Sequence, residues 1–210
     1  MVLFIPEEMR GFSICMFTGI ITHTGTVADK TRTTLAVHAE RDILRTLKKG
    51  GSIAVDGMCL TVTKKTADSF SADVMPETFK RTHFGTLKNG DVINLELPAT
   101  PQTFLSGHIV QGHVDAVGTV KEIKKDGNQH TLAISIPRQF YRYIVSKGSV
   151  TVNGVSLTVI EAKPGSFSVG VIPHTWESTM FRTLKPKTPV NIEVDVLAKY
   201  IERFSSTKDV

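Results

Sequence analysis

The sequence lacks the features that mark secreted and membrane proteins. It has one tryptophan and only two cysteines, Cys15 and Cys59, in 210 residues. Two cysteines are too few for the disulfide framework of a secreted domain, so a reduced cytoplasm suits the chain. No apolar run approaches the roughly 18 residues of a membrane span. We therefore predict a cytoplasmic protein with no membrane partner.

A cationic start followed by a long apolar core is also missing from the first residues. Glu7 and Glu8 interrupt the opening MVLFIPEEMRGFSIC, which makes it a poor signal peptide. We interpret residues 1–15 as a leader or an upstream start. The folded unit is then expected to begin near Met16.

Long runs of like charge are absent, although the net charge is +5. The lysine pairs at 48–49, 64–65 and 124–125 are dispersed and not interleaved with aromatic residues. This pattern is typical of solvated turns at strand ends rather than of a nucleic-acid surface. The positive balance would also serve a small anionic substrate.

What the sequence does contain is typical of β structure. Sixteen glycines and nine prolines lie between short runs of Val, Ile, Leu and Thr, and 40% of the residues are hydrophobic. Helical periodicity appears only in brief patches, so strands should dominate. The first expectation is a barrel or a sandwich.

The chain contains an internal duplication. GSIAVDGMCLTV (51–62) and GSVTVNGVSLTV (148–159) are identical at seven of twelve positions. The stretches 69–96 and 166–193 match at the same offset of 97 residues, and TGIITHTGTV pairs with QGHVDAVGTV at an offset of 93. A gapless register of this length indicates two homologous halves. The second copy changes Asp56 to Asn153 and Cys59 to Ser156.

Each half predicts the same six short strands. The first half has strands at 20–27, 33–38 and 70–74, one at 92–95, and a pair around Asp56-Gly57; the second has them at 114–123, 131–136, 167–171, 190–194 and around Asn153-Gly154. These dipeptides between alternating apolar runs are type I′ hairpin signals. Short helices are expected at 40–47 and 137–145, and at the turns that open with Pro76 and Pro173.

The predicted fold is therefore mostly β: two homologous six-stranded Greek-key barrels with short helices, since closure removes edge strands. The expected boundaries are 16–104 and 105–194, followed by a C-terminal helix and tail at 195–210. Each half is small, so we expect half to pack on half, or chain on chain. The tail helix carries an apolar face that would either cover its own barrel or join subunits: Val196, Leu197, Tyr200, Ile201 and Phe204.

A set of motifs in this order resembles riboflavin synthase. They are MFTGII (16–21), GMCLTV (57–62), SGHIVQGHVD (106–115), KGSVTVNGVSLTV (147–159) and IPHT (172–175). Each motif alone is weak, but the ordered set inside a duplicated barrel is specific. The resemblance spans residues 16–205.

The resemblance implies a transferase for the last step of riboflavin biosynthesis. Two molecules of 6,7-dimethyl-8-ribityllumazine would give riboflavin and 5-amino-6-ribitylamino-uracil by transfer of a four-carbon unit. It implies no metal and no separate cofactor. It also implies a homotrimer whose active sites lie between the N-terminal barrel of one subunit and the C-terminal barrel of its neighbour. An association with lumazine synthase is left open.

Two molecules of one substrate explain a duplicated pocket, and differences between the copies should assign donor and acceptor. The resemblance puts Ser52, Cys59 and Thr61 of the N-terminal pocket near the ring, with Cys59 as nucleophile or proton carrier. It brings Gly19, Ile20 and Ile21 of the first strand to this same pocket. It also implies that the segment 73–78 closes over the pyrimidine edge and ribityl chain of the substrate. Besides Cys59 and Thr61, the expected substrate-binding residues of this pocket are Gly19, Ile20, Ile21, Leu60, Asp73, Val74, Met75, Pro76, Glu77 and Thr78.

His113 is the candidate for proton transfer, because an imidazole titrates near neutral pH; it is flanked by Gly112 and Val114. His108 is interpreted as structural. In the C-terminal pocket the catalytic candidates are Lys147, Ser156 and Thr158, and the expected substrate contacts also include Leu157, Gly170, Val171, Ile172, Pro173, His174 and Thr175. Without the resemblance, the strand cysteine, the histidines and the lysine would be interpreted as packing or solvated residues.

One position departs from the family. Asn153 stands where the family carries an aspartate, and an amide cannot act as a general base. We interpret the carboxylate as unnecessary to the chemistry; the alternative is reduced activity. Other readings are a non-catalytic lumazine or flavin carrier, a flavin-dependent reductase and a plain interaction module. The reductase lacks support, because no G-x-G-x-x-G follows a predicted strand.

Overall fold

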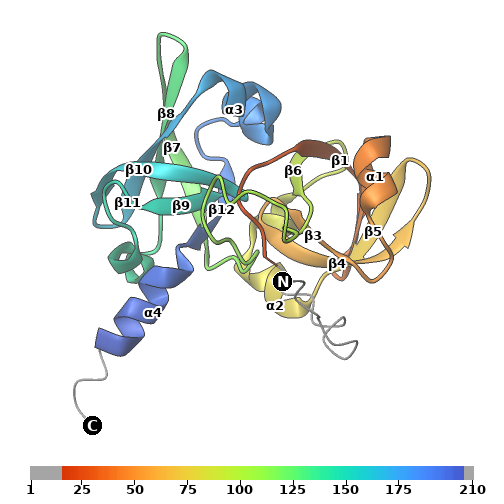
Figure 1. Ribbon diagram of the computed structural model, residues 1–210. Helices are drawn as coiled ribbons and strands as arrows, with labels where there is room; N and C mark the ends of the chain where they lie inside the picture. Colours follow the sequence, from red (N-terminus) through yellow and green to blue (C-terminus); the bar gives the residue numbers. More distant parts are fainter. Residues whose placement is uncertain (1–15, 206–210) are drawn as a thin grey trace.

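Two closed six-stranded antiparallel barrels stand side by side in the computed structural model, which describes residues 16–205 (Figure 1). The expected leader at residues 1–15 lies outside the described residues. The N-terminal barrel has the strand order β1-β2-β5-β4-β3-β6. Its strands are β1 (His23–Lys30), β2 (Thr34–Ala39), β3 (Ser52–Val55), β4 (Met58–Lys65), β5 (Ser69–Asp73) and β6 (Val92–Glu96).

The C-terminal barrel repeats this topology with the order β10-β11-β8-β7-β12-β9. Its strands are β7 (Ala116–Asp126), β8 (Gln129–Ser135), β9 (Ser149–Val152), β10 (Val155–Lys163), β11 (Ser166–Val171) and β12 (Pro189–Val194). The predicted fold, two homologous six-stranded barrels, is confirmed. Apolar side chains alternate inward along each strand and fill two separate cores, one per barrel.

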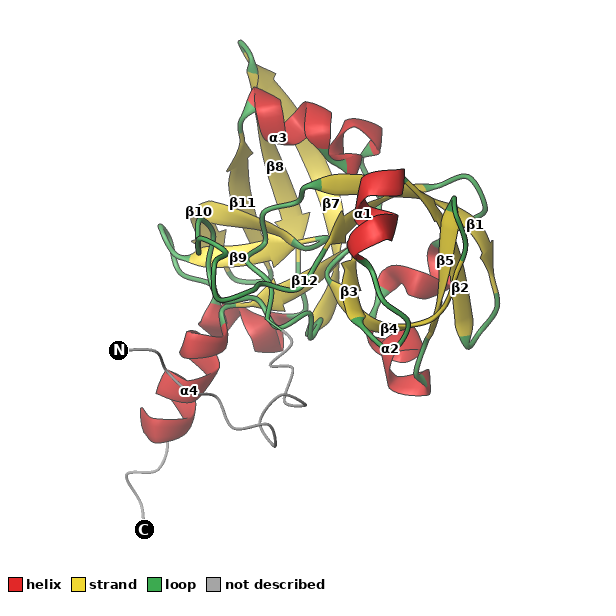
Figure 2. Cartoon of the chain, turned by 45° about the vertical axis from the view of Figure 1, so that its right-hand side comes forward, coloured by secondary structure: helices red, strands yellow, loops and turns green. Residues whose placement is uncertain are grey.

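Short helices close the connections between strands (Figure 2). The N-terminal half has α1 (Arg41–Thr46), α2 (Pro76–Arg81) and the 3-10 helix η2 (His83–Thr86). The C-terminal half has η3 (Arg138–Tyr143), α3 (Pro173–Ser178) and η4 (Met180–Thr183). Pro76 and Pro173 each open a helix, as predicted. The stretch predicted helical at 137–145 is a 3-10 helix.

The leading strands begin later than predicted, at His23 and Ala116. The residues just before them leave the ladder of their own barrel. We call residues 17–21 the first crossing segment and residues 110–114 the second. The two segments touch through an antiparallel bridge between Phe17 and Val110.

The two barrels meet hairpin against hairpin. Asp56 and Asn153 both have φ of 45°, with φ of 77° at Gly57 and 78° at Gly154, so both turns are of type I′ as predicted. A Cβ on Gly57 would lie 2.8 Å from the backbone nitrogen of Gly154, and the reverse distance is also 2.8 Å. The duplication therefore places a local two-fold axis between the hairpins.

Two buried asparagines lock this contact reciprocally. The Asn94 side chain donates to the Asn153 carbonyl at 2.9 Å, and the Asn191 side chain donates to the Asp56 carbonyl at 2.8 Å. Each asparagine also accepts through Oδ1 from a backbone N–H in the other half. Buried amides with several satisfied partners fix one arrangement of the two barrels.

The difference between Asp56 and Asn153 has a partner difference at the same offset. Asp56 Oδ2 faces His83 Nε2 at 3.3 Å, whereas the Asn153 amide faces the Met180 sulfur at 3.4 Å. His83 and Met180 are 97 residues apart, as are Asp56 and Asn153. All four side chains are buried. Asn153 therefore serves the interface between barrels.

The final helix, α4 (Val196–Ser205), projects from the C-terminal barrel away from the N-terminal one in both views (Figures 1 and 2). Only Val196 is buried. Leu197, Tyr200, Ile201 and Phe204 are between 53% and 73% exposed. Of the two roles left open for this helix, covering its own barrel is wrong. No helix within residues 16–205 is long and apolar enough to cross a membrane.

The hairpin contact gives a stability prediction with a matched control. Gly57→Ala and Gly50→Ala both place a side chain at a left-handed backbone position, with φ of 77° and 80°, at a conformational penalty of about 1 to 2 kcal/mol. Only Gly57 has backbone in the way, since nothing lies within 4 Å of a Cβ on Gly50. We expect Gly57→Ala to lose about 1 to 3 kcal/mol more unfolding free energy than the control. Denaturant unfolding measures it; equal losses would contradict the contact.

Candidate active site

A hollow of about 270 Å³ joins the two halves beside Cys59. It lies between β4, α2 and the second crossing segment. Six of the predicted site residues line it: Cys59, Glu77, Thr78, Gly112, His113 and Val114. The structure therefore brings the predicted thiol and the predicted histidine to one cavity, although they are 54 positions apart in the sequence.

The second crossing segment reaches this hollow from the other half of the chain. The Cys59 N–H donates to the Gly112 carbonyl at 2.9 Å. Gly112 has φ of 76°, and a Cβ there would lie 2.7 Å from the Cys59 Cβ, so only glycine fits. Val114 packs against the core of the N-terminal barrel.

The first crossing segment makes the same contact with the opposite barrel. The Ser156 N–H donates to the Gly19 carbonyl at 2.8 Å. A Cβ on Gly19 would lie 2.6 Å from the Ser156 Cβ, and Ile21 packs against the C-terminal core. The prediction that Gly19, Ile20 and Ile21 join Cys59 in the N-terminal pocket is therefore wrong. A repeated sequence does not tell which barrel a linking segment crosses.

This exchange makes the surroundings of Cys59 and Ser156, the centres of the two predicted pockets, unequal. Beside Cys59 the crossing segment supplies His113, whereas beside Ser156 the equivalent position is Ile20. Both residues are exposed. The N-terminal pocket thus has a thiol and an imidazole, and the C-terminal pocket has a hydroxyl and an aliphatic side chain at the same places.

The C-terminal pocket takes its histidine from elsewhere. His108 Nδ1 lies 2.7 Å from Ser156 Oγ, and His108 is only 9% exposed. Burial lowers the pKa of His108, while the Asp195 carboxylate opposes that shift, so the ring is neutral at neutral pH. A neutral imidazole either accepts a hydrogen bond from the hydroxyl or donates one to it, according to its tautomer, and the accepting tautomer can take the hydroxyl proton. The interpretation of His108 as structural alone missed this contact.

Two buried glutamates hold the crossing segments. Glu96 accepts from the Thr18 and Gly19 N–H groups at 2.7 and 3.1 Å. Glu193, its counterpart 97 residues later, accepts from the Gln111 and Gly112 N–H groups at 2.7 and 3.0 Å. Burial raises the pKa of both carboxyls, that of Glu193 to about 7. Sequence reasoning missed both, although their pairing in the repeat was a usable signal.

The segments predicted to close over the substrate lie at the start of α2 and α3, but they also differ. In α2 the Arg81 guanidinium donates to Glu77 at 2.6 Å. This pairing lowers the pKa of Glu77. The equivalent positions in α3 are His174 and Ser178, joined by a bond from the Ser178 hydroxyl to the His174 carbonyl. Arg81 lines the hollow and was not predicted.

The other predicted residues divide by exposure. Thr61, Lys147 and Thr158 are exposed, and Ser52 is half-buried beside Thr61 on the neighbouring strand. Met75, Pro76, Ile172 and Pro173 are exposed, as are Asp73 and Gly170, and Thr175 is half-buried. Four predicted contacts point their side chains into the cores, so only their backbone can meet a ligand: Leu60, Val74, Leu157 and Val171.

Lys147 has an unusual backbone. Its φ is 65°, and the equivalent residue in the first half is Gly50 with φ of 80°. A lysine in this left-handed conformation is disfavoured by about 1 to 2 kcal/mol. Glycine would remove that penalty. Lys187 replaces Gly90 of the first half in the same way, with φ of 76°, so this conformation is shared by two lysines and does not by itself assign a use to the Lys147 amino group.

Comparisons with known proteins agree with this geometry. The lumazine binding domain family matches the chain twice, at residues 18–98 and 111–195. A riboflavin synthase of Photobacterium phosphoreum is 45% identical over 192 residues, which cover 90% of this chain and 88% of that protein. A riboflavin synthase of Mycobacterium bovis is 43% identical over 198 residues, covering 90% and 97%.

The chain belongs to the riboflavin synthase family.

Solved structures of similar fold contain a lumazine or a flavin. LumP complexed with 6,7-dimethyl-8-(1'-D-ribityl)lumazine superposes with a TM-score of 0.77 at 25% identity, covering 85% of this chain and 98% of LumP. LumP complexed with riboflavin gives a TM-score of 0.79 over the same shares. Riboflavin synthase family membership therefore rests on both sequence and fold.

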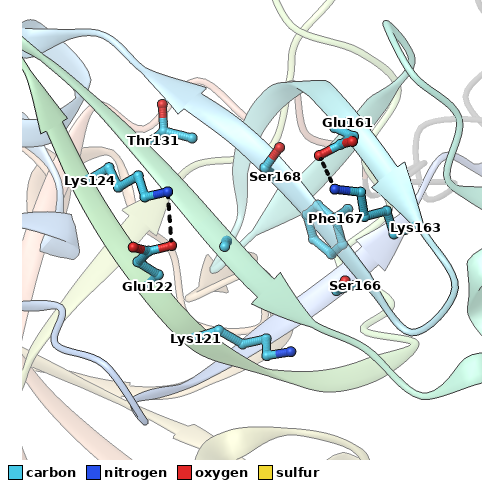
Figure 3. A pocket seen from close by; sticks show the side chains of 10 residues that line it. Lys121, Glu122, Lys124, Thr131, Glu161, Lys163, Ser166, Phe167 and Ser168 are labelled. Atoms are coloured by element: carbon cyan, nitrogen blue, oxygen red, sulfur yellow. Dashed lines mark ion pairs between the residues drawn. The ribbon is translucent and has the colours of Figure 1, made fainter.

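A second hollow of about 420 Å³ lies on the outer wall of the C-terminal barrel and contains none of the predicted riboflavin synthase site residues (Figure 3). Four of its five charged side chains are paired, Lys124 with Glu122 at 3.4 Å and Lys163 with Glu161 at 2.8 Å, and the fifth, Lys121, forms no ion pair among the described residues. Paired exposed charges offer little net field to a ligand. Within residues 16–205 no group of three or more His, Cys, Asp or Glu could hold a metal ion.

Proposed function

We propose that this protein is a riboflavin synthase, which converts two molecules of 6,7-dimethyl-8-ribityllumazine into riboflavin and 5-amino-6-ribitylamino-uracil. The observation that carries the proposal is the unequal surroundings of two equivalent residues, Cys59 and Ser156, in a chain that is 45% identical to a named riboflavin synthase. A dismutation needs two sites for one compound. It also needs a difference between the sites, so that one molecule gives the four-carbon unit and the other receives it.

The chemistry asks for orientation and proton handling. A carbanion must form at the 7-methyl group of one lumazine and attack the ring of the other, and the delocalised ring already acidifies that methyl group. Holding two rings in line contributes up to about 7 to 11 kcal/mol. A positioned acid or base adds about 10² to 10⁴-fold.

Three side chains supply the proton transfers in this proposal. His113 faces the hollow beside Cys59 and takes or returns a proton at the ring in the N-terminal pocket. Ser156 does so in the opposite pocket, with His108 Nδ1 as its proton partner at 2.7 Å. Lys147 and Thr158, both exposed at the same barrel, offset developing negative charge on the second ring.

A homotrimer is part of the proposal, and two features support it. The hollow beside Cys59, about 270 Å³, is smaller than the roughly 300 to 1,000 Å³ of complete small-molecule pockets, so a wall from a second subunit would complete it. The apolar face of α4 is exposed in the described part of a single chain. A docking partner such as lumazine synthase would have to bind elsewhere on that trimer.

The helix gives a prediction of its own. Intact protein is expected to have three times the chain mass of 23.0 kDa, and Ile201→Glu to dissociate it, because a charge would enter the apolar contact. Ile201→Met keeps the apolar surface and should remain trimeric. Light scattering after size exclusion measures both. A wild-type mass of one chain would contradict the trimer.

A non-catalytic carrier is the second candidate, because the LumP structures share this fold and hold lumazine or riboflavin. The deciding experiment mixes purified protein with 6,7-dimethyl-8-ribityllumazine and quantifies products by chromatography. One riboflavin and one pyrimidine per two lumazines consumed establishes the synthase. Bound lumazine that stays unchanged establishes the carrier.

A further inference from the structure

Glu193 stands at an unusual place for a carboxylate. It belongs to β12 between Ile192 and Val194, which are fully buried in the C-terminal core, and it is itself 2% exposed. Burying a carboxylate among apolar side chains is unfavourable unless specific partners compensate. Its partners are two backbone N–H groups of the second crossing segment.

One of the two N–H donors, Gly112, is also hydrogen-bonded to Cys59, which lines the hollow. Glu193 accepts from the N–H of Gly112, and the carbonyl of the same Gly112 accepts from the Cys59 N–H at 2.9 Å. His113 follows directly. A continuous hydrogen-bonded path thus runs from the last strand of one barrel, through the single residue Gly112, to the thiol-bearing strand of the other.

The duplicate half contains the same path. Glu96 accepts from Thr18 and Gly19, and the Gly19 carbonyl accepts from the Ser156 N–H at 2.8 Å. Each barrel therefore uses a buried carboxylate to bind the backbone of the segment that crosses the other barrel. Side chains alternate along a strand, so each glutamate points away from the core into which its neighbours Leu95, Ile192 and Val194 pack, and core packing does not explain the pair.

We propose that Glu193 and Glu96 are positioning residues, which hold the crossing segments so that Gly112 with His113 stays over Cys59 and Gly19 stays over Ser156. Neither touches substrate. Glu193 fixes the N-terminal pocket from the C-terminal barrel, and Glu96 fixes the C-terminal pocket from the N-terminal barrel. The catalytic consequence rests on the proposed function, whereas the positional claim does not.

The surroundings of Glu193 extend this hold toward α4. Asp115 Oδ2 accepts from the Val194 N–H, and Asp115 Oδ1 pairs with Lys199 of α4 at 2.7 Å. The end of the second crossing segment is therefore tied to both β12 and the helix. The first segment has no such hydrogen-bonded link to α4 among the described residues.

The test uses the full-length protein with Glu193→Gln and Glu96→Gln as controls for each other. An amide keeps the size of the side chain but replaces one acceptor oxygen with an NH₂ donor, so one of the two backbone N–H groups then faces another donor. Hydrogen exchange followed by mass spectrometry reports opening of each segment. Product formation is measured in parallel as kcat and KM.

For Glu193→Gln we expect amide exchange at residues 111–113 and Cys59 to rise about ten-fold or more, while residues 17–19 and Ser156 stay protected. Glu96→Gln should give the reverse pattern. Each variant should lower kcat about ten-fold or more with a smaller change in KM, because aligned geometry is lost rather than binding surface. The thermal midpoint should not fall, since a buried charge is removed.

If Glu193→Gln does not fold, Glu193→Asp retains the charge but shortens the reach, and it should show the same pattern to a smaller degree. Exchange that rises equally in both segments, or in neither, overturns the positioning role. If the wild-type protein makes no riboflavin, the function proposed above fails, and the exchange pattern still decides the role of the glutamates.

Discussion

The His83→Met variant is expected to lose about 3 to 5 kcal/mol of unfolding free energy. The substitution leaves the fully buried Asp56 carboxylate facing a thioether instead of His83 Nε2 at 3.3 Å. Asp56 Oδ1 keeps its bond from the Asn94 N–H, but Oδ2, which makes no hydrogen bond among the described residues, loses the close approach of the His83 ring. A buried carboxylate with one unpaired oxygen is strongly unfavourable.

Adding Asp56→Asn to His83→Met is expected to restore most of that loss, because the pair then copies Asn153 and Met180 of the other half. The mirror experiment starts from Asn153→Asp, which places a carboxylate against Met180, and adds Met180→His. With the single variants Asp56→Asn and Met180→His added, denaturant unfolding of six variants forms two double-mutant cycles. Additive losses in both cycles would contradict the pairing.

The His113→Gln variant is expected to lower the turnover of 6,7-dimethyl-8-ribityllumazine by about 10² to 10⁴-fold. Glutamine retains a polar side chain of similar reach but cannot carry a proton through the reaction. KM should change much less, since the hollow keeps its other walls. Steady-state formation of riboflavin measures both constants.

The control for this variant is His38→Gln, which changes an exposed histidine of β2 on the same barrel. It should retain the turnover of the wild-type protein. A His113→Gln protein with unchanged kcat would remove His113 from proton transfer and leave positioning alone as the source of catalysis in that pocket.

The fold was predictable because its signals are local and occur twice. Asp56-Gly57 and Asn153-Gly154 specify type I′ turns by their own backbone preference, and the strands alternate around them. The same repeat predicted which residues are equivalent. Cys59 and Ser156 do occupy matching places, each bonded through its N–H to a glycine carbonyl.

The crossing of the two segments was not predictable, because it is a long-range choice. Gly19 has the same sequence surroundings whether it pairs with β4 of its own half or with β10 of the other. Only the positions of the barrels decide, and they are fixed by Gly57, Gly154 and two buried asparagines. The Glu77–Arg81 pair in the hollow was missed for another reason, since an i, i+4 ion pair on a helix is common on surfaces.

The role of Asn153 could have been inferred one step further. Comparison of the two halves shows that Asp56 becomes Asn153 and that His83 becomes Met180 at the same offset. The second half thus replaces an ionisable side chain by a non-ionisable one at both positions, and such a paired change indicates a shared contact. The sequence alone could not place that contact between the barrels, because Asn153 also satisfies a hairpin turn.

The most direct test of two unequal pockets in one chain is a count of bound ligand. Equilibrium dialysis of 6,7-dimethyl-8-ribityllumazine against the His113→Gln protein, in which turnover is expected to be slow, gives the number of molecules held per chain. We expect two per chain with different affinities, and one fewer when Ser156 is also replaced by a bulky tryptophan. A single lumazine per chain, unaffected by that second change, would contradict the central claim that both barrels hold substrate.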